Sequence, residues 1–177
     1  RMHSLASLNT EKPMHQRLEW MAQNARAFFT EGSYPAKMYD YTQKLYKSGI
    51  SWEQTRDSIY YRYQVKEEDG YDFTSRNLHC NGCFAAGINF GASLISLFYG
   101  EGDYKKTVKI ASLCGWDSDN PAATWGGLLG FIYGSKEIKK LFKFEMSDKY
   151  NIHRTRVNFK NNGIDNFENM AQKSMKI

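Results

Sequence analysis

The stretch GWDSDNPAATWGGLLGFIYG, residues 115–134, decides the fold of this chain. After Pro121 its apolar residues follow helical spacing, which predicts a helix over residues 122–133. Small residues stand four apart along one face of this helix and its end, at Ala122, Gly126, Gly130 and Gly134. Because each glycine weakens a helix by about 1 kcal/mol relative to alanine, this face predicts a groove in which another backbone packs closely.

Outward from this stretch the pattern is helical almost throughout. The spacing of apolar residues, with proline or glycine near most segment ends, predicts further helices over residues 14–29, 36–48, 52–66, 84–99, 104–113 and 135–144. Ser51-Trp52-Glu53-Gln54 is a capping box, and Asp103 is placed to cap the helix that follows it. The segment 84–99 is apolar nearly all round, interrupted by Asn89, Gly91 and Ser93, so it should be the central buried helix.

The remaining sequence completes an all-α prediction. We find no internal repeat and no convincing set of strands. Residues 146–177 are polar and rich in asparagine, and a last helix can form over residues 165–175. We therefore expect a helical region over residues 1–145 and a polar C-terminal extension over residues 146–177.

Composition is typical of a soluble globular protein. The 177 residues are 41% hydrophobic and 24% charged, which suits one domain or a large piece of one. No apolar run reaches the roughly 18–20 residues of a membrane span, so no membrane partner is expected. The net charge of +5 favours anionic ligands, but the one local basic cluster, between Lys136 and Lys143, has the spacing of a solvated helical face. This argues against a nucleic-acid partner.

The three cysteines give a weaker signal. Cys80 and Cys83 form a CxxC pair, but zinc would need further ligands, for which only Cys114 and His79 are at hand. We therefore interpret the pair as small buried cysteines at the entrance of a helix. The odd number of cysteines favours a reducing compartment such as the cytoplasm.

The loop Asp117-Ser118-Asp119-Asn120 carries the chemistry. Two carboxylates with a neighbouring amide oxygen suit Mg²⁺, Mn²⁺ or Ca²⁺. Spacing alone favours the alternative that Asp119 or Asn120 caps the next helix. An EF-hand is excluded, because the positions that need Gly and Glu hold Ala122 and Leu128. A metal here must be held against the helix dipole, whose free amides would suit a phosphate beside it.

Residues 115–123, followed by 126–130 and Tyr133-Gly134, resemble the late signature of the ADP-ribosylglycohydrolase family. That signature is a glycine-containing turn, Asp-x-Asp-Thr and a helix of small residues ending near glycine. A looser resemblance runs from residue 36 to residue 138. Resemblance to this family implies an all-α orthogonal bundle. It also implies an enzyme that uses a pair of magnesium ions to hydrolyse a glycosidic bond of ADP-ribose, or a related N-glycoside.

The resemblance also implies roles for individual residues. Asp117 and Asp119 would be catalytic metal ligands, and Asn120 stands where the family has a threonine ligand. Trp116 replaces a usual glycine and narrows the space beside the metal. Trp116, Ser118 and Tyr133 are the candidate substrate-binding residues. The expected cofactor is Mg²⁺, with Mn²⁺ or Ca²⁺ as alternatives, and the expected partner is an ADP-ribose-type small molecule or an ADP-ribosylated protein.

One departure keeps two hypotheses open. The family's early motif, a threonine followed by paired aspartates, is not found, so we expect a C-terminal portion whose other half is missing, lies on a second chain or was lost in evolution. Retention of Asp117 and Asp119 favours a metal-dependent hydrolase when the site is complete. The missing motif favours a catalytically incomplete binding or assembly module that keeps the fold.

Overall fold

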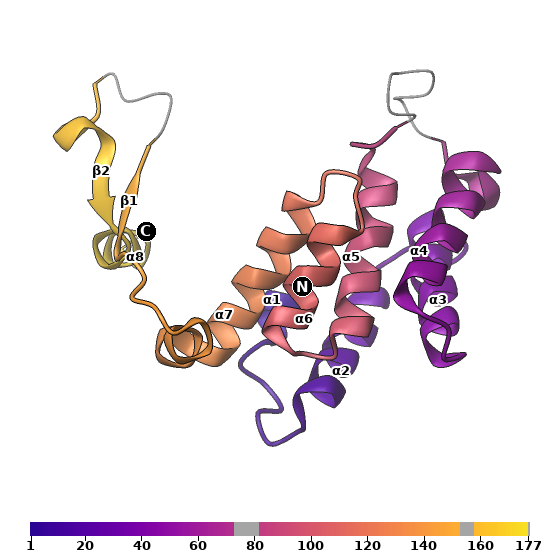
Figure 1. The fold of residues 1–177 in the computed structure, drawn as a ribbon, viewed down its shortest axis with the longest axis horizontal. Helices are drawn as coiled ribbons and strands as arrows, with labels where there is room; N and C mark the ends of the chain where they lie inside the picture. Colours follow the sequence, from indigo (N-terminus) through magenta and orange to yellow (C-terminus); the bar gives the residue numbers. More distant parts are fainter. Residues whose placement is uncertain (73–81, 153–157, 177) are drawn as a thin grey trace. The chain divides into compact units, whose positions relative to one another are not determined.

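The structure, a computed structural model, describes residues 1–72, 82–152 and 158–176 and is predominantly helical (Figure 1). The all-α prediction is confirmed. The chain divides into two compact units, residues 1–134 and 135–177. The domain limits expected at residue 145 stay a prediction. Within the described ranges, no helix combines the length and the apolar character needed to cross a lipid bilayer.

The first unit is built from helices joined by short turns. Its elements are α1 (Met2–Leu5), α2 (Met14–Arg26), α3 (Tyr34–Lys47), α4 (Trp52–Tyr60), the π-helix η1 (Tyr61–Val65), the 3-10 helix η2 (Glu68–Gly70), α5 (Ala86–Gly100), α6 (Tyr104–Leu113) and the first part of α7 (Asp119–Phe142). The helix expected over residues 52–66 therefore ends in one wide π-helical stretch. The other helices expected in this unit are present, with ends that shift by a few residues.

Two of the predicted helix caps are present. Ser51 and Gln54 form the capping box of α4: the Gln54 amide donates to Ser51 Oγ at 3.2 Å, and the Ser51 amide donates to Gln54 Oε1 at 3.1 Å. Asp103 caps α6, where its Oδ1 accepts the Lys106 amide at 2.7 Å. Each cap satisfies amides that the first helical turn leaves without partners, so the chain enters both helices at a fixed residue.

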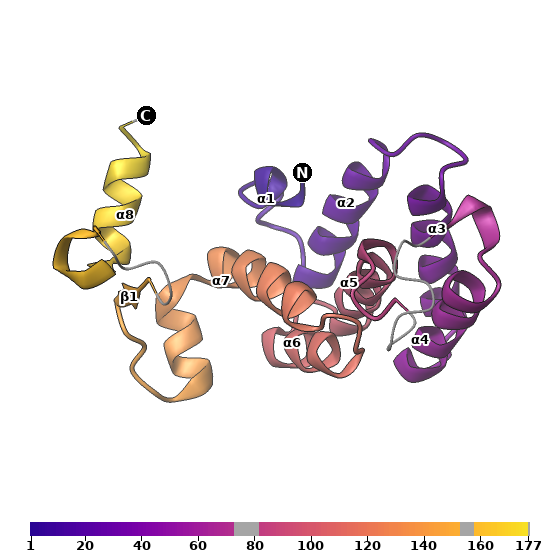
Figure 2. The same cartoon turned by 90° about the horizontal axis from the view of Figure 1, so that it is seen from above.

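α5 is the centre of the first unit, as its apolar sequence predicts. It lies between α6 and the pair α3 and α4 in both views (Figures 1 and 2). Ile88, Ala92 and Ile95 are fully buried. At Gly91 a Cβ atom would lie 2.8 Å from Ile59 Cγ2, closer than side chains normally pack. The missing side chain therefore lets α5 approach α4.

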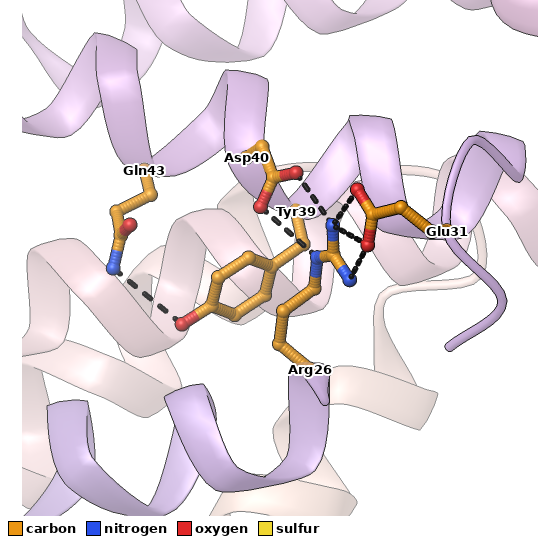
Figure 3. A network of polar contacts seen from close by, with 5 residues as sticks. All are labelled: Arg26, Glu31, Tyr39, Asp40 and Gln43. Atoms are coloured by element: carbon orange, nitrogen blue, oxygen red, sulfur yellow. Dashed lines mark hydrogen bonds and ion pairs between the residues drawn. The ribbon is translucent and has the colours of Figure 1, made fainter. Parts of the chain in front are cut away.

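A polar network joins α2 to α3 at the edge of this core (Figure 3). Arg26 Nε donates to Asp40 Oδ1 at 3.0 Å and its Nη2 donates to Asp40 Oδ2 at 2.7 Å, a two-point pairing. Glu31 accepts from the same guanidinium at 3.2–3.3 Å but is far more exposed. Beside them, burial raises the pKa of Tyr39 to about 12, so this phenol is neutral near pH 7 and accepts a hydrogen bond from Gln43.

Gly134 ends the first unit. Its φ of 76° and ψ of 158° interrupt α7, so residues 119–133 and 135–142 are separate helical stretches, as the sequence predicts. Positive φ is the reason for glycine at this position, because a side chain there is strained. An added Cβ would meet no atom within 4 Å, so space is not the constraint.

The second unit contains a small sheet that the sequence analysis did not predict. Strands β1 (Lys149–Asn151) and β2 (Ile164–Asn166) pair antiparallel with Tyr150 opposite Asp165, and the 3-10 helix η3 (Lys160–Gly163) precedes β2. The strands are three residues long, too short to show an alternating pattern. The last helix is confirmed as α8 (Phe167–Ser174), capped by Asn166, which accepts the Asn169 amide at 2.7 Å.

Candidate functional site

The acidic loop between α6 and α7 has an unusual backbone. Gly115, Trp116 and Asp117 have φ values of 82°, 53° and 62°, so three consecutive residues are left-handed. For the two residues that carry a Cβ this conformation is disfavoured by about 1–2 kcal/mol each. Strain of this kind persists only where surrounding contacts hold the chain, and it is common at functional sites.

The side chain of Asn89 contacts the backbone of this loop at two carbonyls. Its side-chain Nδ2 donates to the carbonyl of Trp116 at 2.9 Å and to the carbonyl of Asp117 at 3.0 Å. Asn89 lies on α5, the central helix, and its own amide donates to Ala85 at 3.1 Å. The loop is therefore tied to the most deeply buried element of the unit.

The Trp116 side chain is a second anchor. Its ring stacks on Tyr60, with centroids 5.7 Å apart and planes 8° apart. Tyr60 is the last residue of α4, directly before the π-helical stretch. Both rings are half-buried. The stack fixes one face of the indole and brings α4 against the acidic loop.

The carboxylates of the loop are accessible. Asp117, Asp119 and Asn120 are exposed, and Ser118 is half-buried. Asn120 donates its side-chain N–H to Asp117 Oδ2, and its backbone amide donates to the Asp117 carbonyl at 3.1 Å. Among the described residues, the Asp119 carboxylate has no hydrogen bond or ion pair with the protein.

The residue at which α7 begins shows whether Asp119 or Asn120 caps this helix. The helix begins at Asp119, and the amide of Ala122 donates to the carbonyl of Ser118 at 3.3 Å. The alternative that Asp119 or Asn120 caps the helix is therefore wrong, because both lie inside its first turn. Pro121 has no N–H and the amide of Asn120 is already bonded. In the described structure this leaves the amides of Ser118 and Asp119 free for an anion.

Side chains, more than a backbone groove, attach α7 to its neighbours. Trp125 Nε1 donates to the Ser93 carbonyl on α5 at 2.8 Å. A Cβ on Gly126 would lie 3.3 Å from the Tyr104 hydroxyl, whereas a Cβ on Gly127 or Gly130 would meet nothing within 4 Å. Of the glycines in the predicted groove, only Gly126 has atoms of another helix within 4 Å of an added Cβ, and they are side-chain atoms of Tyr104 and Val108 on α6. No backbone packs against these glycines within the described residues.

Tyr133 lies at the far end of the same helical stretch. Fourteen residues separate it from Asp119, about 21 Å along a helix axis. Its hydroxyl donates to the carbonyl of Gly102 at 2.7 Å, which ties α7 to the turn between α5 and α6. The structure thus gives Tyr133 a packing role, and its substrate role stays a prediction.

The cysteine interpretation needs one correction. Cys83 is disulfide-bonded, so it is not a free buried thiol. Cys114 is free and buried, and burial raises the pKa of its thiol to about 12, which makes it a poor nucleophile near neutral pH. Cys80, His79 and Asn81 lie outside the described residues.

The donor chemistry of the loop fits a hard cation in part. Asp117 and Asp119 offer exposed carboxylate oxygens. Asn120 turns its amide nitrogen, not its oxygen, toward Asp117. A cation bound by both residues would require this amide to rotate, because the oxygen of an amide binds a hard cation and its NH₂ group does not. The described ranges hold no group of three or more His, Cys, Asp and Glu side chains able to bind a metal.

The structure shows an all-α unit with an anchored acidic turn before a glycine-containing helix, and the comparison with known families gives the class of protein. The chain matches the ADP-ribosylglycohydrolase family over residues 4–163 and belongs to it. This supports a glycohydrolase-type function. Among curated proteins and solved structures, none matches the chain.

Sequence reasoning missed two residues of this site. Tyr60 gave no signal, because an aromatic residue on a helix predicts core. Asn89 did give a signal in the sequence, because it is an amide side chain within an apolar helix. Such a residue usually has a specific hydrogen-bond partner.

Proposed function

We propose that the protein hydrolyses a glycosidic bond of ADP-ribose, or of a related N-glycoside, with a divalent cation held in part by Asp117 and Asp119. The observation that carries this proposal is the position of both exposed carboxylates on a loop anchored to the core, inside the region that matches the family. A fixed loop suits this task because ligand side chains must be held within a fraction of an ångström.

The residues of the chain would divide the work as follows. Asp117 and Asp119 bind the cation, for which Mg²⁺ is the first candidate. When bound, the cation supplies an activated water and neutralises developing charge. The free amides of Ser118 and Asp119, at the start of α7, suit a phosphate oxygen of the substrate. Trp116 has one ring face on Tyr60, so its other face is the one that would pack on a planar ring.

A second candidate function is a binding or assembly module without catalysis. It is favoured by one observation: the described residues bring no third acidic, histidine or cysteine side chain to the two aspartates. In such a module the loop would bind an ADP-ribose-type ligand and leave its glycosidic bond intact.

The test is the double variant Asp117→Asn with Asp119→Asn. It keeps the size of both side chains and removes their charge, so Mg²⁺-dependent release of ADP-ribose from an ADP-ribosylated protein should fall to background. The matched control is Glu137→Gln with Glu145→Gln, which removes two carboxylates that pair only with exposed lysines. Turnover that is equal in both double variants contradicts the proposed role of the loop.

The same protein separates the two candidate functions. Isothermal titration with ADP-ribose, with and without Mg²⁺, measures binding independently of turnover. Binding by the unaltered protein without any release of ADP-ribose from a substrate supports the module. Release that depends on Mg²⁺ supports the hydrolase.

A further inference from the structure

We propose that Asn89 is a positioning residue, which fixes the direction in which Asp117 presents its carboxylate. The task given to that carboxylate rests on the proposed function. The placement of the carboxylate by Asn89 is a separate claim, which stands on the contacts between α5 and the acidic loop.

The two hydrogen bonds of Asn89 fall on both sides of one Cα atom. The Trp116 carbonyl belongs to the peptide that precedes the Asp117 Cα, and the Asp117 carbonyl belongs to the peptide that follows it. A single NH₂ group donates to both, at 2.9 Å and 3.0 Å. Because two peptide planes determine the direction of the Cα–Cβ bond between them, one amide group sets the direction in which the Asp117 side chain leaves the backbone. The bond from Asn120 to Oδ2 then limits the rotamer of that side chain.

The loop needs such a contact because its conformation is disfavoured without one. Trp116 and Asp117 are both left-handed, with φ of 53° and 62°. Residues with a Cβ leave this region readily when nothing holds them. The stack on Tyr60 holds the Trp116 ring, and Asn120 holds one carboxylate oxygen and, through its backbone amide, the Asp117 carbonyl. Among the described residues, Asn89 is the one whose side chain donates to both carbonyls.

The location of Asn89 suits a positioning role better than a purely structural one. It interrupts the apolar sequence of α5 with a side chain that can donate two hydrogen bonds. Its side-chain N–H groups are directed at the loop and not at its own helix. Residues behind a metal ligand that orient it in this way typically change metal affinity by about 10–100-fold when they are replaced.

The experiment compares three variants of the protein. Asn89→Leu keeps the size and removes both donors, Asn89→Gln keeps the amide on a longer side chain, and Ser93→Ala is the control. Ser93 lies one turn along α5, and its hydroxyl donates only within that helix, to the Asn89 carbonyl at 3.0 Å. Circular dichroism establishes that each variant is folded. If Asn89→Leu does not fold, Asn89→Gln carries the test.

Two readouts are measured. The first is hydrogen exchange without metal at the Asn120 amide, which donates to the Asp117 carbonyl. The second is the dissociation constant for Mn²⁺, measured by titration. In Asn89→Leu we expect exchange at least tenfold faster and a dissociation constant about 10–100-fold higher. Asn89→Gln should lie between, and Ser93→Ala should match the unaltered protein.

The outcomes separate this inference from the proposed function. If hydrogen exchange at the Asn120 amide is unchanged in Asn89→Leu, the inference is overturned, whatever the dissociation constant for Mn²⁺. Faster exchange with unchanged Mn²⁺ affinity also overturns it, because the residue then stabilises the loop without positioning a ligand. If the unaltered protein binds no Mn²⁺, the proposed function fails. Exchange alone then decides: unchanged exchange at Asn120 overturns the inference, and faster exchange supports the contact between Asn89 and the loop on which the inference rests.

Discussion

Replacement of Gly91 by alanine tests whether the close approach of α5 and α4 fixes the core that carries Asn89. A Cβ at this position would lie 2.8 Å from Ile59 Cγ2 and 3.3 Å from Met38 Sδ. Overpacking of a core costs about 1–3 kcal/mol, whereas alanine in place of glycine stabilises a helix by about 1 kcal/mol. The expected net effect is therefore a loss of about 0–2 kcal/mol.

A matched substitution isolates the packing contribution. Gly127 lies in α7, and a Cβ there would meet nothing within 4 Å. Gly127→Ala therefore gains helix propensity alone and should stabilise by about 1 kcal/mol. The difference between the two variants, about 1–3 kcal/mol, measures the contact with Ile59, because the chemical change is the same.

The assay is urea unfolding at 25 °C followed by far-ultraviolet circular dichroism. The same comparison in an Ile59→Ala background should abolish most of the difference, because the Cγ2 atom is gone. In an Ile59→Val background the difference should persist, because valine keeps both γ carbons. The reasoning is refuted if Gly91→Ala is as stable as Gly127→Ala, or if its cost survives in the Ile59→Ala background.

Two further predictions concern polar contacts of the first unit. Asp40→Asn should cost about 1 kcal/mol of stability, because it breaks a two-point pairing with the mostly buried guanidinium of Arg26. Glu31→Gln should cost less than about 0.5 kcal/mol, because the Glu31 carboxylate is 86% exposed. Equal costs of the two substitutions in thermal unfolding would contradict this ranking. For Asp69, burial acts to raise the pKa, but hydrogen bonds from Arg62 and Tyr63 outweigh it and hold the pKa below its ordinary value. Its stabilisation is therefore complete above about pH 5 and is lost as the pH falls toward the folded-state pKa, so Asp69→Asn should lower stability near pH 7 and flatten its decline between about pH 5 and pH 3. Urea midpoints across this range check the sign, and an unchanged acid slope would count against the paired state of Asp69.

The candidate site shows how far sequence reasoning reaches and where it stops. Asp117 and Asp119 could be predicted as site residues because paired acidic residues in a turn are a local pattern, and their role stays a prediction. Asn89 lies 28 residues before Asp117, and nothing local tells which loop its amide will meet. The bond between Asn120 and Asp117 is local, but its direction depends on the left-handed backbone that the α5 contact stabilises.

By itself the sequence determined most of the helices, two of their caps and the break in α7. Helical periodicity, the Ser51 capping box and the need for positive φ at Gly134 are properties of neighbouring residues, so they are written in the local chain. Only the tertiary structure decided which side chains share a site. Asn89 on α5, Tyr60 on α4 and the acidic loop meet because the glycines and apolar faces of α5 let the helices pack closely, and such contacts between distant residues leave no periodic signal in a single sequence.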